Sequence, residues 1–158
     1  MNFMTSQPGT DPIVVEGYFP ASPDRVFNAW TNPDIIVKWF GTAPNSLHSA
    51  TIDLRLGGAW QFIKTKDDTK TVGFEGEYKE INLNEKLLFS WSHVITHADG
   101  ERDASPYSQV EVTFSAKGKG TYVHLTHSTV RSEDARRGIG GGWEASFGFL
   151  EDALSPKI

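Results

Sequence analysis

The chain has 158 residues, which is long enough for one domain with a substantial core and short for two. Apolar residues make up 38% and aromatic residues 12%, with five Trp and ten Phe, so large rings supply much of the burial. A net charge of -5 opposes binding to polyanions, which requires clustered Lys and Arg, and we therefore expect no nucleic-acid partner.

The sequence contains no cysteine, which excludes disulfides and thiolate chemistry and is typical of a reducing compartment. No segment approaches the roughly 18 consecutive apolar residues of a membrane helix, and no secretion signal begins the chain. We therefore expect a cytoplasmic protein with no membrane partner. Residues 1–12 are polar and lack periodicity, so we predict a flexible tail there and a single domain over residues 13–158.

The first predicted elements are a strand and two short helices. Alternating apolar residues predict the strand over residues 13–19. An N-cap serine, Ser22, followed by a proline and an acidic residue, marks the start of a helix that ends near residue 30. A second short helix follows over residues 34–40.

The rest of the chain predicts strands and then a helix. Alternation of apolar and polar residues predicts further antiparallel strands over about residues 50–56, 60–62, 74–78, 87–93, 110–114 and 123–127. In the C-terminal segment, apolar residues recur at steps of four, three and four, which predicts a long amphipathic helix. These residues are Trp143, Phe147, Leu150 and Leu154.

This order of elements predicts an α+β fold. A curved antiparallel sheet of about six or seven strands can bury its concave face only against the long C-terminal helix. Such a wrapped sheet encloses space. Whether side chains fill that space or leave it open decides between a structural core and a binding cavity.

Five stretches of the chain carry a family resemblance. They are FPASPDRVFNAWTNPDIIVKWFG at 19–41, DLRLGGAWQF at 53–62, GFEGEYKEINLNEKLLFSWSH at 73–93, VEVTFSAKGKGTYVHLTH at 110–127 and GWEASFGFLEDAL at 142–154. In order and spacing they resemble the START-like superfamily (SRPBCC, Bet v 1-like), and within it the activator of heat-shock-protein ATPase homologue family. The resemblance implies a helix-grip fold whose cavity, between sheet and long helix, takes lipids, polyketides or other hydrophobic ligands. It also implies a heat-shock chaperone as a partner.

The run GIGGGW at 138–143 is richer in glycine than the family pattern. Each glycine inside a helix costs about 0.5 to 1 kcal/mol relative to alanine. We therefore expect the last helix to kink, fray or pack unusually close to a neighbour at this point.

The predicted cavity wall combines the inward rows of the strands with the apolar stripe of the last helix. The candidate ligand-binding residues are Trp39, Trp60, Phe62, Phe74, Tyr78, Phe89, Trp91, His93, Val112, His127, Trp143 and Phe147. A lining of this kind suits an apolar ligand. The alternative is that the same side chains interdigitate and fill the core.

Four polar side chains share the inward parity: His48, Tyr78, His93 and His127. A buried polar group needs a hydrogen-bond partner, so each of them could orient a ligand carbonyl or hydroxyl. A histidine could also transfer a proton near neutral pH. The alternative is that the backbone, neighbouring side chains or water satisfy these groups.

The sequence predicts neither a metal nor a cofactor. His124 and His127 would point to opposite faces of a strand, and no HExxH pair, nucleophile elbow or phosphate-binding glycine motif is present. A protein that binds a lipid, polyketide or aromatic metabolite is therefore favoured over an enzyme.

Two other functions stay open. One is a co-chaperone-like regulator of a heat-shock chaperone ATPase, and the other is an enzyme of the cyclase or hydrolase type that uses a cavity histidine as acid or base. The expected partners are a hydrophobic small molecule and, from the resemblance, a heat-shock chaperone. The chain could also form a homodimer.

Overall fold

The computed structural model describes residues 4–7, 9–130 and 132–155. Over these residues the chain forms nine strands and three helices. In chain order they are β1 (Met4–Gln7), β2 (Ile13–Phe19), α1 (Pro23–Thr31), α2 (Pro33–Trp39), β3 (Ser49–Ile52), β4 (Ala59–Lys66), β5 (Lys70–Asn82), β6 (Lys86–His97), β7 (Arg102–Ala104), β8 (Ser108–Lys117), β9 (Gly120–Ser128) and α3 (Glu133–Leu154). None of the helices in the described ranges is both long and apolar enough to cross a lipid bilayer.

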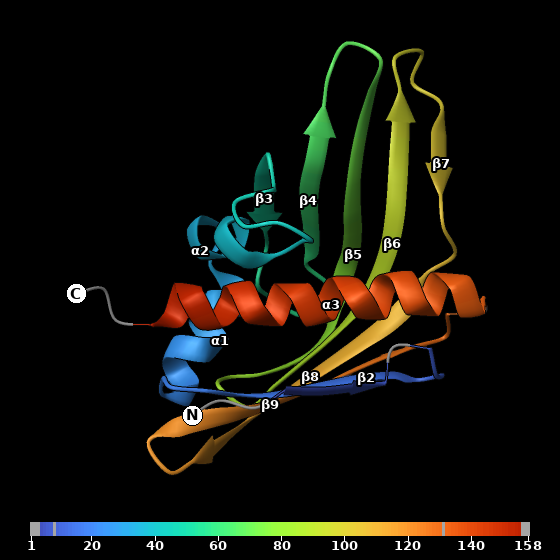
Figure 1. Cartoon of the computed structure of the whole chain (residues 1–158). Helices are drawn as coiled ribbons and strands as arrows, with labels where there is room; N and C mark the ends of the chain where they lie inside the picture. The colour runs from blue at the N-terminus through green and yellow to red at the C-terminus, as the bar shows by residue number, and fades with distance from the viewer. Residues whose placement is uncertain (1–3, 8, 131, 156–158) are drawn as a thin grey trace.

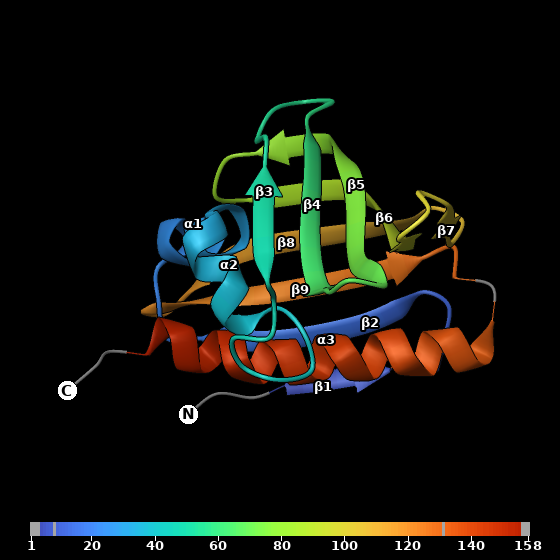
Figure 2. The ribbon, with the colours of Figure 1, turned by 90° about the horizontal axis from the view of Figure 1, so that it is seen from above.

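All the strands pair antiparallel in one sheet, in the order β1-β2-β9-β8-β6-β5-β4-β3, with β7 paired to β6. Figure 1 shows that β2, β8 and β9 lie along α3, whereas β4, β5 and β6 rise away from it. Seen from above, α3 runs beside β2 and β9, and β3, β4 and β5 cross their direction (Figure 2). The predicted helix-grip fold, with two short helices after the first long strand, is confirmed.

The sheet bends where the β5–β6 ladder is interrupted. Glu75 pairs with Ser92 and Tyr78 pairs with Phe89, but the backbone N–H of Glu77 donates to the Ser90 hydroxyl at 3.0 Å. A register shift follows directly, between Tyr78 and Glu80. Irregularities of this kind bend the strand that carries them and increase its twist.

Gly76 is required at the bend. A Cβ atom added at this position would lie 1.8 Å from the carbonyl oxygen of Ser90, which is backbone and cannot move aside. The close approach of the two strands therefore depends on the missing side chain.

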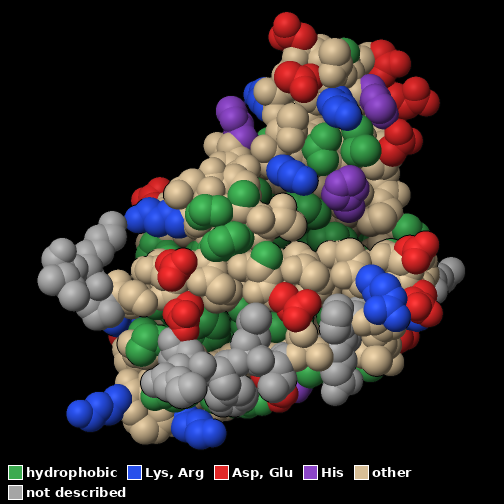
Figure 3. All heavy atoms as spheres, viewed as in Figure 1, with side chains coloured by type: hydrophobic (Ala, Val, Ile, Leu, Met, Phe, Trp, Pro, Cys, Tyr) green, Lys and Arg blue, Asp and Glu red, His purple; other side chains and the backbone are tan. Residues whose placement is uncertain are grey.

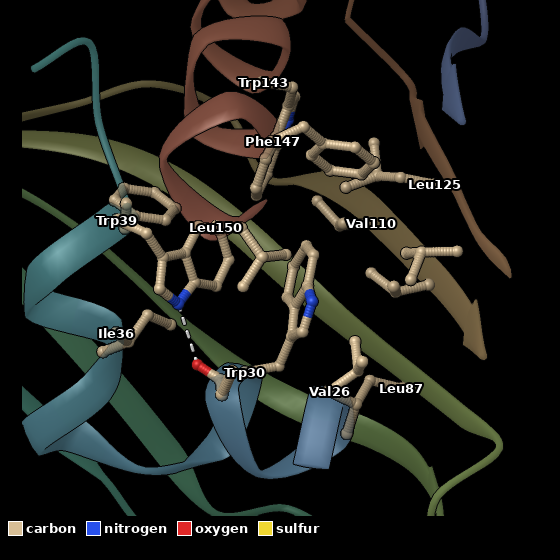
Figure 4. Close-up of a cluster of buried hydrophobic side chains, with 14 of the residues drawn as sticks. Val26, Trp30, Ile36, Trp39, Leu87, Val110, Leu125, Trp143, Phe147 and Leu150 are labelled. Carbon is tan, nitrogen blue, oxygen red and sulfur yellow. Dashed lines mark hydrogen bonds between the residues drawn. The ribbon is translucent and has the colours of Figure 1, made fainter. Parts of the chain in front are cut away.

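Beneath the C-terminal half of α3, the core is packed with aromatic rings. The Trp30 ring lies 4.8 Å from that of Trp39 in an edge contact and 5.8 Å from that of Trp143 in a stacked one. The Trp39 indole N–H donates to the carbonyl of Ala29 at 2.9 Å, as the dashed line in Figure 4 shows. Edge and stacked ring pairs add about 0.5 to 1.5 kcal/mol each to the free energy gained from burial. This half of the sheet–helix interface is closely packed.

The predicted flexible tail is wrong for Met4–Gln7, which forms β1. This strand pairs with β2, with Met4 opposite Gly17 and Gln7 opposite Val14. The Ser6 hydroxyl also donates to the carboxylate of Glu144 on α3. An edge strand held by backbone pairing does not need the apolar alternation from which strands were predicted. The rest of the predicted tail includes residues 1–3 and 8, which lie outside the described residues.

The strand predicted over residues 50–56 ends earlier, at Ile52, because a turn begins at Asp53. The N–H of Arg55 donates to the carbonyl of Asp53 at 2.9 Å, and Gly57 has a positive φ of 78°. Leu54 and Leu56 are therefore exposed, at 41% and 71%, rather than inward as their parity predicted. The strand count is nine rather than about six or seven because β1 and β7 carry no apolar alternation.

Replacement of Gly76 by alanine is expected to lower the free energy of unfolding by more than about 2 kcal/mol, since the Cβ collides with backbone. The control is Gly141→Ala on α3, where a Cβ meets no atom within 4 Å. That change should raise stability by about 0.5 to 1 kcal/mol through helix propensity. Urea denaturation followed by circular dichroism measures both, and an unchanged stability for Gly76→Ala would contradict the role assigned to the bend.

Candidate ligand-binding cavity

A cavity of about 500 Å³ lies between α3 and the strands that rise away from it. The N-terminal half of α3 forms its floor, β4, β5 and β6 form its wall, and the α2–β3, β7–β8 and β9–α3 connections line the rest together with Ser108 on β8. In Figure 3, green apolar side chains gather in the hollow above the helix, and blue and purple side chains lie on the strands above it. The volume is in the range of small-molecule sites.

The glycine run predicted to disturb α3 instead opens the cavity floor. The helix is continuous from Glu133 to Leu154, so the expected kink or fraying is absent. Gly138 and Gly142 stand one turn apart and both line the cavity. A Cβ atom at Gly138 would meet nothing within 4 Å, and one at Gly142 only the Thr42 methyl group at 4.0 Å. At these positions the missing side chains therefore enlarge the cavity rather than allow close packing.

Aromatic rings form the apolar part of the lining. The Phe40 ring centroid lies 5.5 Å from that of Phe74 on β5 and 5.5 Å from that of Trp143 on α3. Phe74 in turn lies 5.1 Å from Trp91 on β6. Phe40 thus meets Phe74 and Trp143 edge to face, Trp91 packs tilted against Phe74, and the four rings form an apolar surface at the cavity.

Polar groups of the strand wall come from β4, β6 and the β7–β8 connection. His93 lines the cavity, is half buried, and donates its backbone N–H to the Ser105 hydroxyl at 2.9 Å. Burial and, secondarily, the positive charge of Lys64 lower the pKa of His93. Lys64 follows Trp60 and Phe62 along the inner face of β4 and is largely exposed at the cavity edge.

His127 lies behind the cavity wall and is fully buried. Its Nδ1 accepts a hydrogen bond from the Trp143 indole N–H at 3.0 Å, and its Nε2 lies 2.6 Å from the Ser108 hydroxyl oxygen. An indole only donates, so Nδ1 carries no proton and Nε2–H donates to Ser108. The Ser108 hydroxyl then donates to the Trp91 carbonyl at 3.2 Å.

This hydrogen-bond chain fixes His127 in its neutral form. Burial lowers the pKa of His127 to about 3. Both ring nitrogens are occupied by protein groups, and the ring does not line the cavity. His127 therefore positions Trp143 and Ser108 in the wall and cannot exchange a proton with a ligand near neutral pH.

The structure brings four of the predicted lining residues to the cavity: Phe74, Trp91, His93 and Trp143. Four others, Trp60, Phe62, Tyr78 and Phe89, surround a separate void of only about 10 Å³. Trp39, Val112 and Phe147 are buried in the packed core, and His127 lies behind the wall. These eight therefore do not line the cavity of about 500 Å³. Parity assigned the strand residues among them to the inner face, but the bend divides that face into a filled half and an open half.

Three of the four polar residues expected to orient a ligand lie elsewhere, His127 behind the wall and the other two outside the lining. Burial raises the pKa of the Tyr78 phenol, which lies at the small void. His48 is exposed on the α2–β3 connection. Of the four, His93 alone lines the cavity.

Sequence reasoning missed Lys64, the serines of the lining and the glycines of the floor. The alternation along the strand could have identified Lys64, because this residue continues the inward row of Trp60 and Phe62. Gly138 and Gly142 could also have been identified, since the glycine run that contains them departs from the family pattern. Ser105 lies on the β7–β8 connection, where no periodic pattern in the sequence indicates which way a side chain points. In the part of the chain that the structure describes, no three His, Asp or Glu side chains are arranged to hold a metal ion.

The fold and the cavity together define a helix-grip protein with an open space between its sheet and its long helix. The chain belongs to the Activator of Hsp90 ATPase homolog 1-like protein family, whose model matches residues 20–155. No curated protein matches the chain.

Solved structures share the fold. Protein Ms6760 from Mycobacterium smegmatis matches with a TM-score of 0.76 and 19% identity, over 99% of this chain and 98% of that one. CalU16 from Micromonospora echinospora matches with a TM-score of 0.64 and 26% identity, over 99% of this chain and 85% of that one. DynU16, a protein in the dynemicin biosynthetic locus, matches with a TM-score of 0.70 and 23% identity, over 92% of this chain and 47% of that one.

His127 is expected to make stability depend on pH. Between about pH 6.5 and pH 3 the unfolded chain binds a proton at this residue and the folded chain does not, so stability falls as the pH falls. The contribution is up to about 1.4 kcal/mol per pH unit. Urea denaturation at pH 7, 6 and 5 should show a shallower slope for His127→Gln than for the parent chain.

A nuclear magnetic resonance titration of the parent chain checks the same claim without a substitution. The His127 ring should stay neutral down to about pH 4, as its lowered pKa requires. Protonation near pH 6, or equal slopes for the two proteins, would contradict the hydrogen-bond assignment.

Proposed function

We propose that the protein binds a hydrophobic small molecule, such as a lipid, polyketide or aromatic metabolite, in the cavity between α3 and β4–β6. One observation carries the proposal. Beside a core of closely packed rings, the chain leaves about 500 Å³ open and lines it with Phe40, Phe74, Trp91 and Trp143. Protein interiors normally contain few voids larger than a water molecule, so an apolar space of this size favours a ligand over a packing defect.

The composition of α3 supports the same conclusion. Helix-forming residues at Gly138 and Gly142 would add stability, about 0.5 to 1 kcal/mol each, and nothing blocks their side chains. Larger side chains at these positions would also occupy the cavity. The helix thus gives up stability at the two positions where a side chain would exclude a ligand.

An enzymatic role would depend on His93. His127 is neutral and enclosed, and among the described residues that line the cavity His93 supplies the only imidazole. The ring of His93 makes no hydrogen bond to a described acid or nucleophile, and a histidine in this setting fits ligand orientation better than acid–base catalysis. A heat-shock chaperone partner and a homodimer stay predictions.

Titration with N-phenyl-1-naphthylamine, a neutral fluorophore, tests the proposal. The parent chain should give saturable enhancement at one site, and Gly142→Phe should weaken binding at least about tenfold by filling the cavity. The matched control is Gly141→Phe on the same helix, since Gly141 is exposed and does not line the cavity.

The control should bind like the parent chain, and circular dichroism should show both variants folded. Absence of saturable binding by the parent chain would contradict the proposal. Equal weakening by the two substitutions would do so as well, because it would place the fluorophore outside the cavity.

A further inference from the structure

We infer that the ligand is an amphipathic acid, whose carboxylate binds Lys64, His93 and Ser105 while its apolar body lies against the rings of the cavity. The inference rests on the proposed function and adds the chemical class of the ligand. It follows from the charge of the lining, the position of Lys64 and the hydrogen-bond donors in the wall that can turn to a ligand.

The charge of the lining is opposite to that of the chain. The whole sequence contains 20 acidic and 15 basic residues, for a net charge of -5. Among the described residues that line the cavity there is no Asp or Glu, and the ionisable side chains there are Lys64 and His93. A cation beside apolar walls acts through a lower effective dielectric constant than in water and so attracts an anion more strongly.

Lys64 stands apart from the ion pairs on the strands. Some basic side chains of the sheet have acidic partners, among them Lys86 with Glu80 at 3.3 Å and Arg102 with Glu75 at 2.6 Å, and the lysines without one, such as Lys66, do not line the cavity. Within the described ranges, Lys64 forms no salt bridge, and it follows Trp60 and Phe62 on the inner face of β4. Its ammonium group is therefore available to a ligand at the edge of an apolar surface.

The neighbouring groups are hydrogen-bond donors. The ring of His93 makes no hydrogen bond to another described residue, and its pKa is lowered, so near neutral pH it presents one N–H donor. The Ser105 hydroxyl accepts from the His93 backbone N–H, while the hydroxyl of Ser92 donates to the Ser105 carbonyl at 2.6 Å. The other contact of the Ser105 hydroxyl, with the Ser92 hydroxyl oxygen, is long at 3.4 Å, so the Ser105 hydrogen can turn to a ligand instead.

A carboxylate matches this set of groups because it accepts hydrogen bonds and carries negative charge. A ligand ammonium group would be repelled by Lys64. An alcohol would use the donors but would gain no charge-assisted hydrogen bond, and such bonds are about twice as strong as neutral ones. The wall thus discriminates between an acid and a neutral molecule of the same shape.

The experiment compares matched ligands that differ only in the head group. Dodecanoate and 1-dodecanol each displace N-phenyl-1-naphthylamine from the folded chain at pH 7.5, and 1-naphthaleneacetate and 1-naphthaleneethanol provide a ring-bearing pair. In at least one pair the parent chain should bind the acid at least about tenfold more tightly than the alcohol. Lys64→Met should reduce this preference to less than about threefold while leaving alcohol binding within about twofold.

Lys66→Met is the matched control, because Lys66 lies on the same strand, is exposed and does not line the cavity. It should keep the preference for the acid. Equal binding of acid and alcohol in both pairs, or equal loss in the two lysine variants, would overturn the inference while the cavity still binds. Failure of the parent chain to bind the fluorophore and all four compounds would overturn the proposed function, and the inference with it.

Discussion

The bend in β5 and β6 is the constraint on which the rest of the structure depends. At Gly76 the two strands approach so closely that only a glycine fits, and the ladder resumes after a shift near Glu80. Beyond this point β4, β5 and β6 leave the surface of α3, as Figure 1 shows. A sheet that followed the helix along its whole length would bury the inner face of the sheet and the facing side of the helix completely. Because this one bends, the interface has a filled half and an open half.

The two halves have different physical roles. In the filled half, rings such as Trp30, Trp39 and Phe147 pack edge to face, and this burial stabilises the fold. In the open half, the lining side chains gain less free energy from burial, and α3 carries glycines where larger side chains would fit. His127 lies at the boundary, where its two hydrogen bonds connect α3 to β8 and fix the Trp143 ring in the cavity wall. A buried network in which every group has a partner favours one arrangement of the wall.

The sequence was sufficient to predict the architecture, but it could not predict which residues line the cavity. Alternation and helical periodicity predicted β2, the central strands and α3, because each has one buried face. Strand parity and the helical stripe could not show where the sheet turns away from the helix, so Trp60 and Tyr78 from the strands and Phe147 from the helix were predicted to line the cavity. Lys64 could have been found from its position after Phe62. β1 and Ser105 could not, since backbone pairing and loop conformation leave no periodic signal.

Apolar ligands are expected to enter the open half of the interface and not the filled half. An amide chemical-shift titration with 1-dodecanol tests this most directly, because it reports each residue separately. Shifts are expected at Gly138, Gly142 and His93, which line the cavity, with little change at Val26 and Val123 in the packed core. Shifts confined to the exposed turn around Leu54 and Leu56, with none along α3, would contradict it.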